Sequence, residues 1–217
     1  MTYSLLDIRL EMPRHPTRIW RVRTDVKRIV VHTTGSDNQD PKKTGRYHVT
    51  PSKQNHISKR GAPGLCYHDF ITKCGVVYHC NNYQDIVWHT KGWNGTGVGV
   101  CLAFRGQTGE APPLFQYIAL VDHLVVLCLY LKVLPKNVKG HRESPLIYTL
   151  LPGGKRKYRK TCPGMGISLH LLRAKVTNGL QERLSSEGLY TGKIDGLFGR
   201  KSICALRAFK PCHSRIL

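Results

Sequence analysis

Residues 28–36 read RIVVHTTGS, a β-branched run that ends on a histidine. The run Arg28 to Val31 is short, apolar and rich in β-branched side chains, which predicts a buried strand. His32 follows directly, so its imidazole is expected where the strand ends, a place where functional sites are often built. The sequence therefore directs attention to other residues that could join an imidazole in a reactive site.

Two later segments supply such residues: KGHRE, residues 139–143, contains His141, and RKTCPG, residues 159–164, contains Cys162. Two imidazoles and a thiolate are zinc ligands, and a catalytic zinc takes three protein ligands and keeps its fourth position for water. Spacing alone does not single out this triple, because 11 His and 8 Cys offer many others. Local context favours it, since Lys160 and a Pro-Gly turn beside Cys162 would favour the thiolate and fix the backbone.

A family resemblance rests on five segments: RIVVHTTGS, LCYHDFIT (65–72), NGTGVGVCLAF (94–104), KGHRE and RKTCPGMGI (159–167). They occur in the order seen in zinc-dependent N-acetylmuramoyl-L-alanine amidases, whose fold is shared with peptidoglycan recognition proteins. The match covers about residues 1–170 and most resembles the phage-lysozyme branch. One departure is a basic insert, residues 145–160, that is longer than the family pattern.

The resemblance implies a Zn²⁺ site and assigns roles to particular residues. The ligands fall on His32, His141 and Cys162, and the assisting catalytic residues on Tyr67 and Lys160. Cys101 occupies a position where other amidases of this fold carry a Glu general base, so the version of the mechanism that uses Tyr and Lys is expected. His68 follows Tyr67 on a predicted strand and should therefore point to the opposite face.

The segment IVWHTKGWNG, residues 86–95, is expected to form an exposed Gly- and Asn-rich loop. By resemblance it lines the substrate groove, which makes His89, Trp93 and Asn94 candidate substrate-binding residues. Two alternatives stay open: His89 could face solvent, and the tryptophan could anchor the loop instead of stacking on a sugar.

The end of the chain, GLQERLSSEGLYTGKIDGLFGRKSICALRAFK (179–210), resembles the peptidoglycan-binding domain of cell-wall hydrolases. Its leucines fall near a helical period and its glycines interrupt the pattern, as in a small helical module. The resemblance implies wall contacts by Asp195, Gly196 and Phe198. Alternatively, Asp195 only caps a tight turn with its carboxylate. The expected division is a catalytic domain over residues 1–170 and a wall-binding module over residues 174–217.

Interleaved strands and helices predict the α/β class, with a mixed central β-sheet flanked by helices and a small C-terminal helical module. Strands are expected at 28–31, 96–104 and 138–141, a hairpin at 68–72 and 76–78, and a helix at 115–131. The apolar window 117–134 is interrupted by polar residues, which predicts a buried helix and no transmembrane segment.

The 217 residues carry 34 Lys and Arg against 13 Asp and Glu, a net charge of +21 that predicts an anionic partner. Bacterial peptidoglycan, an anionic cell wall or an outer-membrane surface would all fit, and no motif for dedicated nucleic-acid binding accompanies the charge. The eight cysteines form no regular framework, which favours synthesis in a reducing compartment, although Cys74 and Cys80 could pair across a hairpin.

These observations predict a monomeric phage endolysin that cleaves the amide bond between N-acetylmuramic acid and L-alanine with zinc-activated water. The N-terminus lacks the pattern of a secretory signal, so the enzyme is expected in the host cytoplasm until a membrane pore releases it to the wall. Two alternatives remain open: a non-catalytic peptidoglycan recognition protein and a basic nucleic-acid-binding protein.

Overall fold

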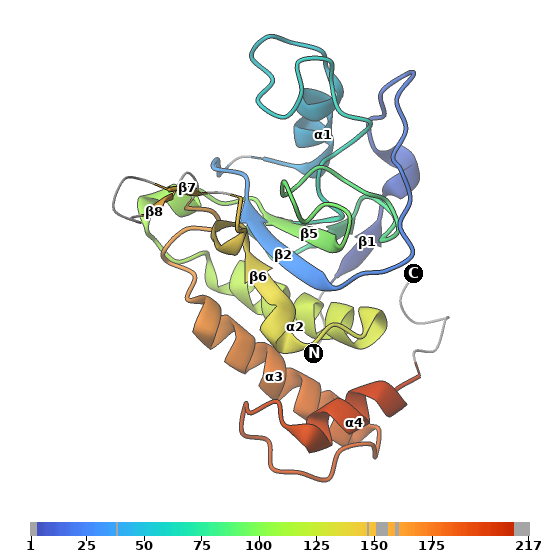
Figure 1. Cartoon of the computed structure of the whole chain (residues 1–217), viewed down its shortest axis with the longest axis vertical. Coiled ribbons are helices and arrows are strands. Elements are labelled where there is room, and N and C mark those ends of the chain that lie inside the picture. The colour runs from blue at the N-terminus through green and yellow to red at the C-terminus, as the bar shows by residue number, and fades with distance from the viewer. Residues whose placement is uncertain (1–3, 38, 147, 151–155, 159–160, 211–217) are drawn as a thin grey trace.

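The computed structural model describes residues 4–37, 39–146, 148–150, 156–158 and 161–210 (Figure 1). At its centre is a six-stranded mixed sheet with the order β1-β4-β3-β5-β2-β6. Its strands are β1 Leu5–Asp7, β2 Arg28–Thr33, β3 Asp69–Ile71, β4 Val77–His79, β5 Gly97–Leu102 and β6 Val138–Gly140. The pairs β1–β4, β3–β5, β5–β2 and β2–β6 are parallel, and β3–β4 is antiparallel. The predicted α/β class is confirmed.

Strand β2 lies next to the edge strand β6, and both of its own edges are paired. It runs beside β5 from Arg28 to Thr33 and beside β6 from Ile29 to Val31. Ile29 and Val31 belong to the main core, so the alternating residues Val30 and His32 face the other side of the sheet. The sheet thus separates an apolar core on one face from the side on which His32 lies.

Helices cover the two faces unequally (Figure 1). Helix α1, Pro41–Val49, lies on the His32 side and begins at Asp40, whose carboxylate accepts a hydrogen bond from the Lys43 backbone at 2.7 Å. Helix α2, Leu114–Leu131, packs on the other face, with α3, Leu169–Ser186, and α4, Arg200–Ala208, beyond it. The core therefore lies between the sheet, α2 and α3.

Helix α2 is long and apolar enough to cross a membrane by length and composition alone, and 56% of it is buried. Its buried residues include Leu120, Leu124 and Leu127, which belong to the same cluster as the strands. A core helix passes the same length and hydropathy test, and the packing seen here is that of a core helix, as the interrupted apolar pattern predicts.

Most of the expected elements are present, with small shifts at their ends. The β3–β4 hairpin is confirmed, and β5 is shorter than the predicted strand 96–104. Three elements were not predicted: strand β1, helix α1 and a second sheet within the basic insert. This second sheet is antiparallel and consists of β7 Tyr148–Leu150 and β8 Arg156–Tyr158. Cys74 and Cys80, which could have paired across the hairpin, are both free thiols; Cys74 is exposed and Cys80 is buried.

The predicted domain boundary falls inside α3, which is one continuous helix from Leu169 to Ser186. Its residues Leu172, Val176, Leu180 and Leu184 belong to the same buried cluster as α2 and the strands. The C-terminal segment therefore completes the core of the sheet domain, and truncation at residue 173 would remove part of that core.

Within the C-terminal segment, Gln181 on α3 holds the following loop. Its amide oxygen accepts from the backbone of Asp195 and Gly196 at 3.1 and 3.0 Å, and its amide nitrogen donates to the Leu197 carbonyl at 3.1 Å. The Asp195 carboxylate accepts from the Leu197 backbone at 2.9 Å, so it closes the turn, as the alternative interpretation of this residue predicts.

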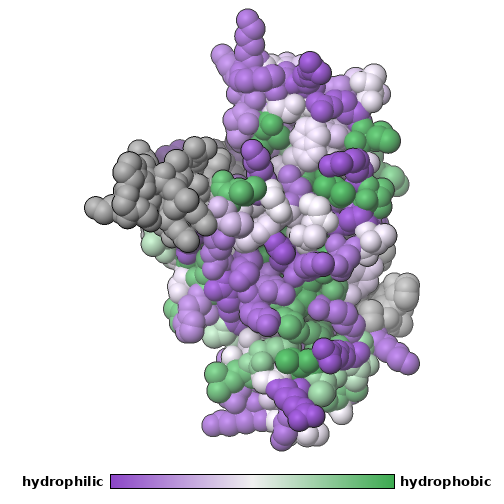
Figure 2. Space-filling model, viewed as in Figure 1, coloured by the Kyte–Doolittle hydropathy of each residue, from purple (hydrophilic) through white to green (hydrophobic). Residues whose placement is uncertain are grey.

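Hydrophilic side chains dominate the face drawn in Figure 2, and the larger apolar patches on it lie toward the end of the molecule that holds α3 and α4. Exposed apolar residues from this end of the chain are Leu171, Leu189, Ile194 and Leu197. The face drawn is thus mainly polar, and other exposed apolar residues, such as Leu10, Ile19 and Phe115, come from earlier parts of the chain.

The approach of α3 to α2 can be tested at Gly179. A Cβ atom there would lie 2.7 Å from Val125 Cγ2 of α2, so Gly179→Ala should lower the free energy of unfolding by about 1–3 kcal/mol, although Ala is the better helix former. Urea unfolding would measure this, with the exposed Lys175→Ala as the control on the same helix. A Gly179→Ala protein as stable as the control would contradict the packing of α3 on α2.

Candidate metal centre

The three predicted ligands come together at one edge of the sheet. His32 is the fifth residue of β2, and His141 begins the short 3-10 helix that follows β6. Because these parallel strands end at the same edge, the two imidazole centroids lie 4.6 Å apart. Cys162 reaches the same place from the segment before α3, with its Sγ 3.8 Å from His32 Nδ1. One candidate ligand atom from each residue lies within 4.8 Å of the others.

Hydrogen bonds hold the cysteine in this position. The backbone N–H of Thr33 donates to Cys162 Sγ at 3.3 Å, an interaction that favours a thiolate. The backbone N–H of Arg142 donates to the Cys162 carbonyl at 2.8 Å, and its guanidinium donates to the carbonyls of Gly164 and Ile167. Because Arg142 directly follows His141, its hydrogen bonds connect the backbones next to two of the candidate ligands. The sequence alone did not predict this role.

The donor set and its spacing fit zinc. Zinc binds imidazole nitrogen at about 2.0–2.1 Å and thiolate at about 2.3 Å, so tetrahedral ligand atoms lie about 3.3–3.8 Å apart. The distance of 3.8 Å between Cys162 Sγ and His32 Nδ1 is at the upper end of that range. The ligand atoms lie within 4.8 Å of one another, so the most distant pair would need to approach by about 1 Å to bind one zinc. His32 is buried and the other two residues are half-buried, so the centre is open on one side.

Tyr67 stands next to the candidate centre, with its ring centroid 5.2 Å from that of His32. Burial, together with nearby thiol groups, raises the pKa of its phenol well above the usual value. Its hydroxyl is therefore protonated at neutral pH, and it forms a hydrogen bond with the Cys101 thiol. Cys101 is fully buried, and burial raises the pKa of its thiol as well, so this position offers no general base.

His89 is not exposed, contrary to the expectation for its loop: only 6% of its surface is accessible. Its Nδ1 lies 3.1 Å from His32 Nε2, and His89 is one of the residues that line the groove beside the candidate centre; burial lowers its pKa to about 3. The expectation failed because Gly and Asn residues indicated a solvent-facing loop, whereas the loop folds inward over β5. His68 does point away from the centre, toward a buried Arg23 guanidinium 2.7 Å away.

A groove of about 1110 Å³ runs past the candidate centre. Asn94 lines it, but its side-chain oxygen accepts from the Thr90 backbone at 2.6 Å and so closes the loop. Trp93 is not among the lining residues; its ring lies under the Arg28 guanidinium at 4.9 Å, which makes it a loop anchor. Trp88 lines the groove instead, as do Lys43 and Lys91, and no Asp or Glu occurs among the described lining residues.

Lys160, the second predicted catalytic residue, lies outside the described residues. Gly196 and Phe198 of the predicted wall-binding loop line a smaller hollow of about 380 Å³ against α3, remote in sequence from the ligands. Asp195 is not among its lining residues and serves the turn described above.

The sequence itself places this geometry in a known family, since residues 22–165 match the N-acetylmuramoyl-L-alanine amidase family. The chain belongs to that family. Its solved structural neighbours include the Ph2119 endolysin from a Thermus scotoductus bacteriophage, with a TM-score of 0.59 and 21% identity over 80% of this chain and 99% of that one. The endolysin amidase LysCS from Clostridium intestinale gives 0.57 and 20% over 80% and 95%, and Drosophila PGRP-LB gives 0.55 and 18% over 76% and 89%. No curated protein matches the chain.

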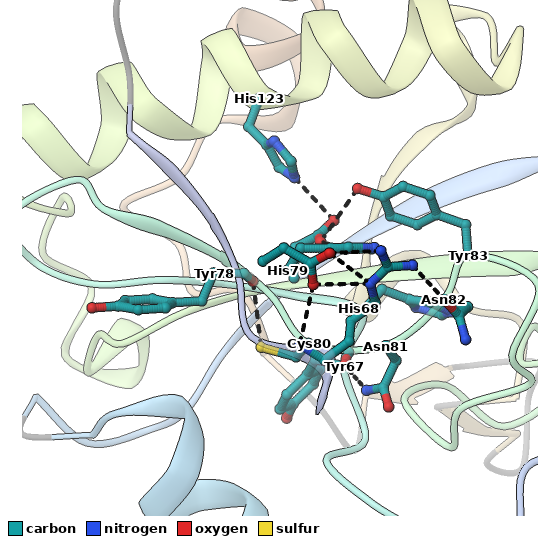
Figure 3. Close-up of polar contacts among 12 residues, drawn as sticks. Tyr67, His68, Tyr78, His79, Cys80, Asn81, Asn82, Tyr83 and His123 are labelled. Atoms are coloured by element: carbon teal, nitrogen blue, oxygen red, sulfur yellow. Dashed lines mark hydrogen bonds and ion pairs between the residues drawn. The ribbon is translucent and has the colours of Figure 1, made fainter. Parts of the chain in front are cut away.

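The chain also contains a buried polar cluster on the opposite face of the sheet, between β3, β4 and α2. Figure 3 shows His123, on α2, and Tyr83 pointing toward one carboxylate, which belongs to Asp69. Its oxygens lie 2.7 Å from His79 Nδ1 and 2.9 Å from His123 Nε2. Burial opposes ionisation of this carboxyl, but the two imidazoles outweigh it and hold the pKa of Asp69 well below the usual value. Sequence reasoning did not single out this cluster.

Removing this charge should destabilise the protein in a pH-dependent way. Because the Asp69 pKa is lower in the folded than in the unfolded chain, its stabilisation is present above its unfolded pKa of about 3.9 and is lost as pH falls below it. Asp69→Asn should therefore cost about 3–5 kcal/mol at pH 7 and less near pH 3. Urea unfolding at both pH values measures this, with the exposed Asp25→Asn as control. An equal loss at both pH values would contradict the assignment.

Proposed function

We propose that this protein is a zinc-dependent peptidoglycan hydrolase that cleaves the amide bond between N-acetylmuramic acid and L-alanine. The observation that carries the proposal is the convergence of His32, His141 and Cys162 beside a groove, within the segment that matches the amidase family. The endolysin amidases among the structural neighbours share the fold and are consistent with this role.

In this proposal His32, His141 and Cys162 hold the zinc. A bound zinc would supply Lewis acidity, which polarises the scissile carbonyl and activates water for attack. The Thr33 N–H stabilises negative charge on the Cys162 sulfur. Arg142 keeps the His141 and Cys162 backbones in register, so the donor set is organised before the metal binds.

Tyr67 is the described residue best placed to act on the reacting amide. Its protonated hydroxyl would donate a hydrogen bond to the oxyanion that forms when water attacks the carbonyl, or to the leaving amine. From the sequence resemblance, Lys160 would add a positive charge two residues from Cys162. With a neutral, buried Cys101 in place of a carboxylate, proton transfer in this chain would not involve a protein carboxylate on that strand.

The charge of the groove is consistent with a peptidoglycan substrate. Lys43 and Lys91 line it and the described lining residues include no carboxylate, so the groove favours the carboxylate-bearing stem peptides of the wall. The C-terminal segment would add affinity for the insoluble polymer through the loop that carries Gly196 and Phe198. A protein of this kind would act as an endolysin, held in the host cytoplasm until it is released to the wall.

Peptidoglycan recognition proteins among the structural neighbours keep a second candidate open, a receptor that binds the wall without cleaving it. The complete set of three candidate ligands in this chain favours the enzyme. Incubation with isolated peptidoglycan separates the two functions, because hydrolysis at the proposed bond releases new L-alanine amino termini and leaves the number of reducing sugar ends unchanged.

Cys162→Ser tests the metal-dependent part of the proposal. The wild-type protein should bind about one zinc per chain, and the variant should lose both zinc and wall hydrolysis, because a serine hydroxyl is a poor zinc ligand at neutral pH. Zinc content and released L-alanine termini are the measurements, and Cys204→Ser, an exposed thiol on α4, is the matched control. Full hydrolysis by the Cys162→Ser protein would rule out this metal site.

Tyr67→Phe separates transition-state assistance from metal binding. The variant should retain zinc and peptidoglycan affinity and lose about ten- to a thousandfold in turnover, because only the donor hydroxyl is removed. Lys160→Ala is expected to behave in the same way. Turnover on soluble muropeptides and zinc content would be measured together, and loss of zinc from the Tyr67→Phe protein would show that Tyr67 is a structural residue of the centre.

A further inference from the structure

His89 and His32 form a buried pair of imidazoles at the candidate centre. Their Nδ1 and Nε2 atoms lie 3.1 Å apart, and the rings meet edge to face with centroids 5.2 Å apart. The other nitrogen of His89, Nε2, lies 3.0 Å from the Gly97 carbonyl oxygen. The Thr90 hydroxyl lies 3.0 Å from His89 Nδ1 and 3.3 Å from His32 Nε2.

This chain of contacts dictates where the protons sit. A carbonyl oxygen only accepts hydrogen bonds, so His89 Nε2 carries a proton and donates it to Gly97. In neutral His89 the Nδ1 atom then holds a lone pair, so the 3.1 Å contact is a hydrogen bond only if His32 donates from its Nε2. Neutral His32 is left with its lone pair on Nδ1, the atom that lies 3.8 Å from Cys162 Sγ.

We propose that His89 is a positioning residue that fixes the His32 tautomer and ring orientation so that Nδ1 faces the metal position. This inference rests on the proposed zinc site. It assigns His89 a role beside the ligand, in addition to the position in the groove that was expected from the sequence. Metal-bound histidines commonly donate their second ring N–H to a carboxylate, a backbone carbonyl or water, and here another imidazole would accept that hydrogen.

The strand beneath His89 is shaped to admit its ring. A Cβ atom on Gly99 would lie 2.8 Å from His89 Cγ, and one on Gly97 would lie 3.2 Å from His89 Cε1. Both glycines alternate with the core residues Val98 and Val100, so they occupy the His32 face of β5. The absence of side chains at these two positions lets the His89 imidazole pack directly against the sheet, which explains a Gly-Val-Gly sequence in a central strand.

The loop that carries His89 is tied down independently of the ligands. Asn94 accepts from the Thr90 backbone at 2.6 Å, and the Arg23 guanidinium donates to the carbonyls of Asn94 and Tyr83. A buried cation therefore clamps both ends of the loop around His89, as expected if the position of this ring matters to the site.

Nitrogen-15 NMR of the imidazole rings in the metal-free wild-type protein tests the proposal without a mutation. The His32 signal, assigned by its absence in His32→Gln, should show the tautomer protonated at Nε2, and His89 should show the same tautomer. A His32 ring protonated at Nδ1 in the folded protein would overturn the inference.

Variants test the consequence for metal binding. His89→Leu should weaken zinc binding about 10- to 100-fold, measured by competition with a chromophoric chelator, while His89→Asn should recover much of the loss because its amide oxygen can accept near the Nδ1 position. Gly99→Ala should mimic His89→Leu, since the three atoms nearest to its added Cβ all belong to His89. Gly95→Ala on the same loop, where nothing lies within 4 Å of the added Cβ, is the matched control and should match the wild type.

The outcomes separate this inference from the proposed function. A wild-type protein that binds no zinc would refute the zinc site itself. A wild-type protein that binds zinc, with His89→Leu and Gly99→Ala binding it equally tightly, would leave the zinc site intact and overturn the role of His89. Thermal unfolding of each variant, followed by circular dichroism, identifies any that fail to fold, and in that case the wild-type NMR result decides the question.

Discussion

Strand β2 lies between β5 and β6, and its parallel pairing with both brings the carboxyl ends of three strands to one edge of the sheet. His32 near the end of β2 and His141 just after β6 are adjacent because of this pairing, although they are far apart in the sequence. Once these imidazoles are fixed, a single thiol from a third segment completes a zinc-type donor set. The rest of the structure serves to hold the three segments together.

The C-terminal helices take part in that support. Leu169 at the start of α3 packs so close to β6 that a Cβ atom on Gly140 would lie 2.8 Å from its Cδ1 atom, immediately before His141. Further along α3, buried leucines join the core formed by α2 and the strands. Helix α3 therefore connects the segment that resembles a wall-binding module to the residues packed beside His141, and both belong to one folded unit.

Much of the central sheet could be predicted because its strands have strong local patterns, such as the apolar run before His32 and the β3–β4 hairpin. Helix α1 was missed because its sequence, PKKTGRYHV, is polar and short, with no apolar stripe to mark a helix. The domain boundary was placed inside α3 because the resemblance began near Gly179. The spacing of Leu169, Leu172 and Val176 already continued the same helical period toward Leu180, a signal that could have corrected it. The inward fold of the His89 loop depends on contacts with Gly97 and Gly99 of β5 that no local pattern in the loop encodes.

X-ray absorption at the zinc edge tests the central claim, that His32, His141 and Cys162 form one zinc centre. The account predicts one sulfur ligand at about 2.3 Å and two imidazole nitrogens at about 2.0–2.1 Å, with a light atom from outside the protein in the fourth position. Loss of the sulfur shell in Cys162→Ser would assign it to this residue. A zinc bound without sulfur, or by two or more sulfurs, in the wild-type protein would contradict the proposed centre.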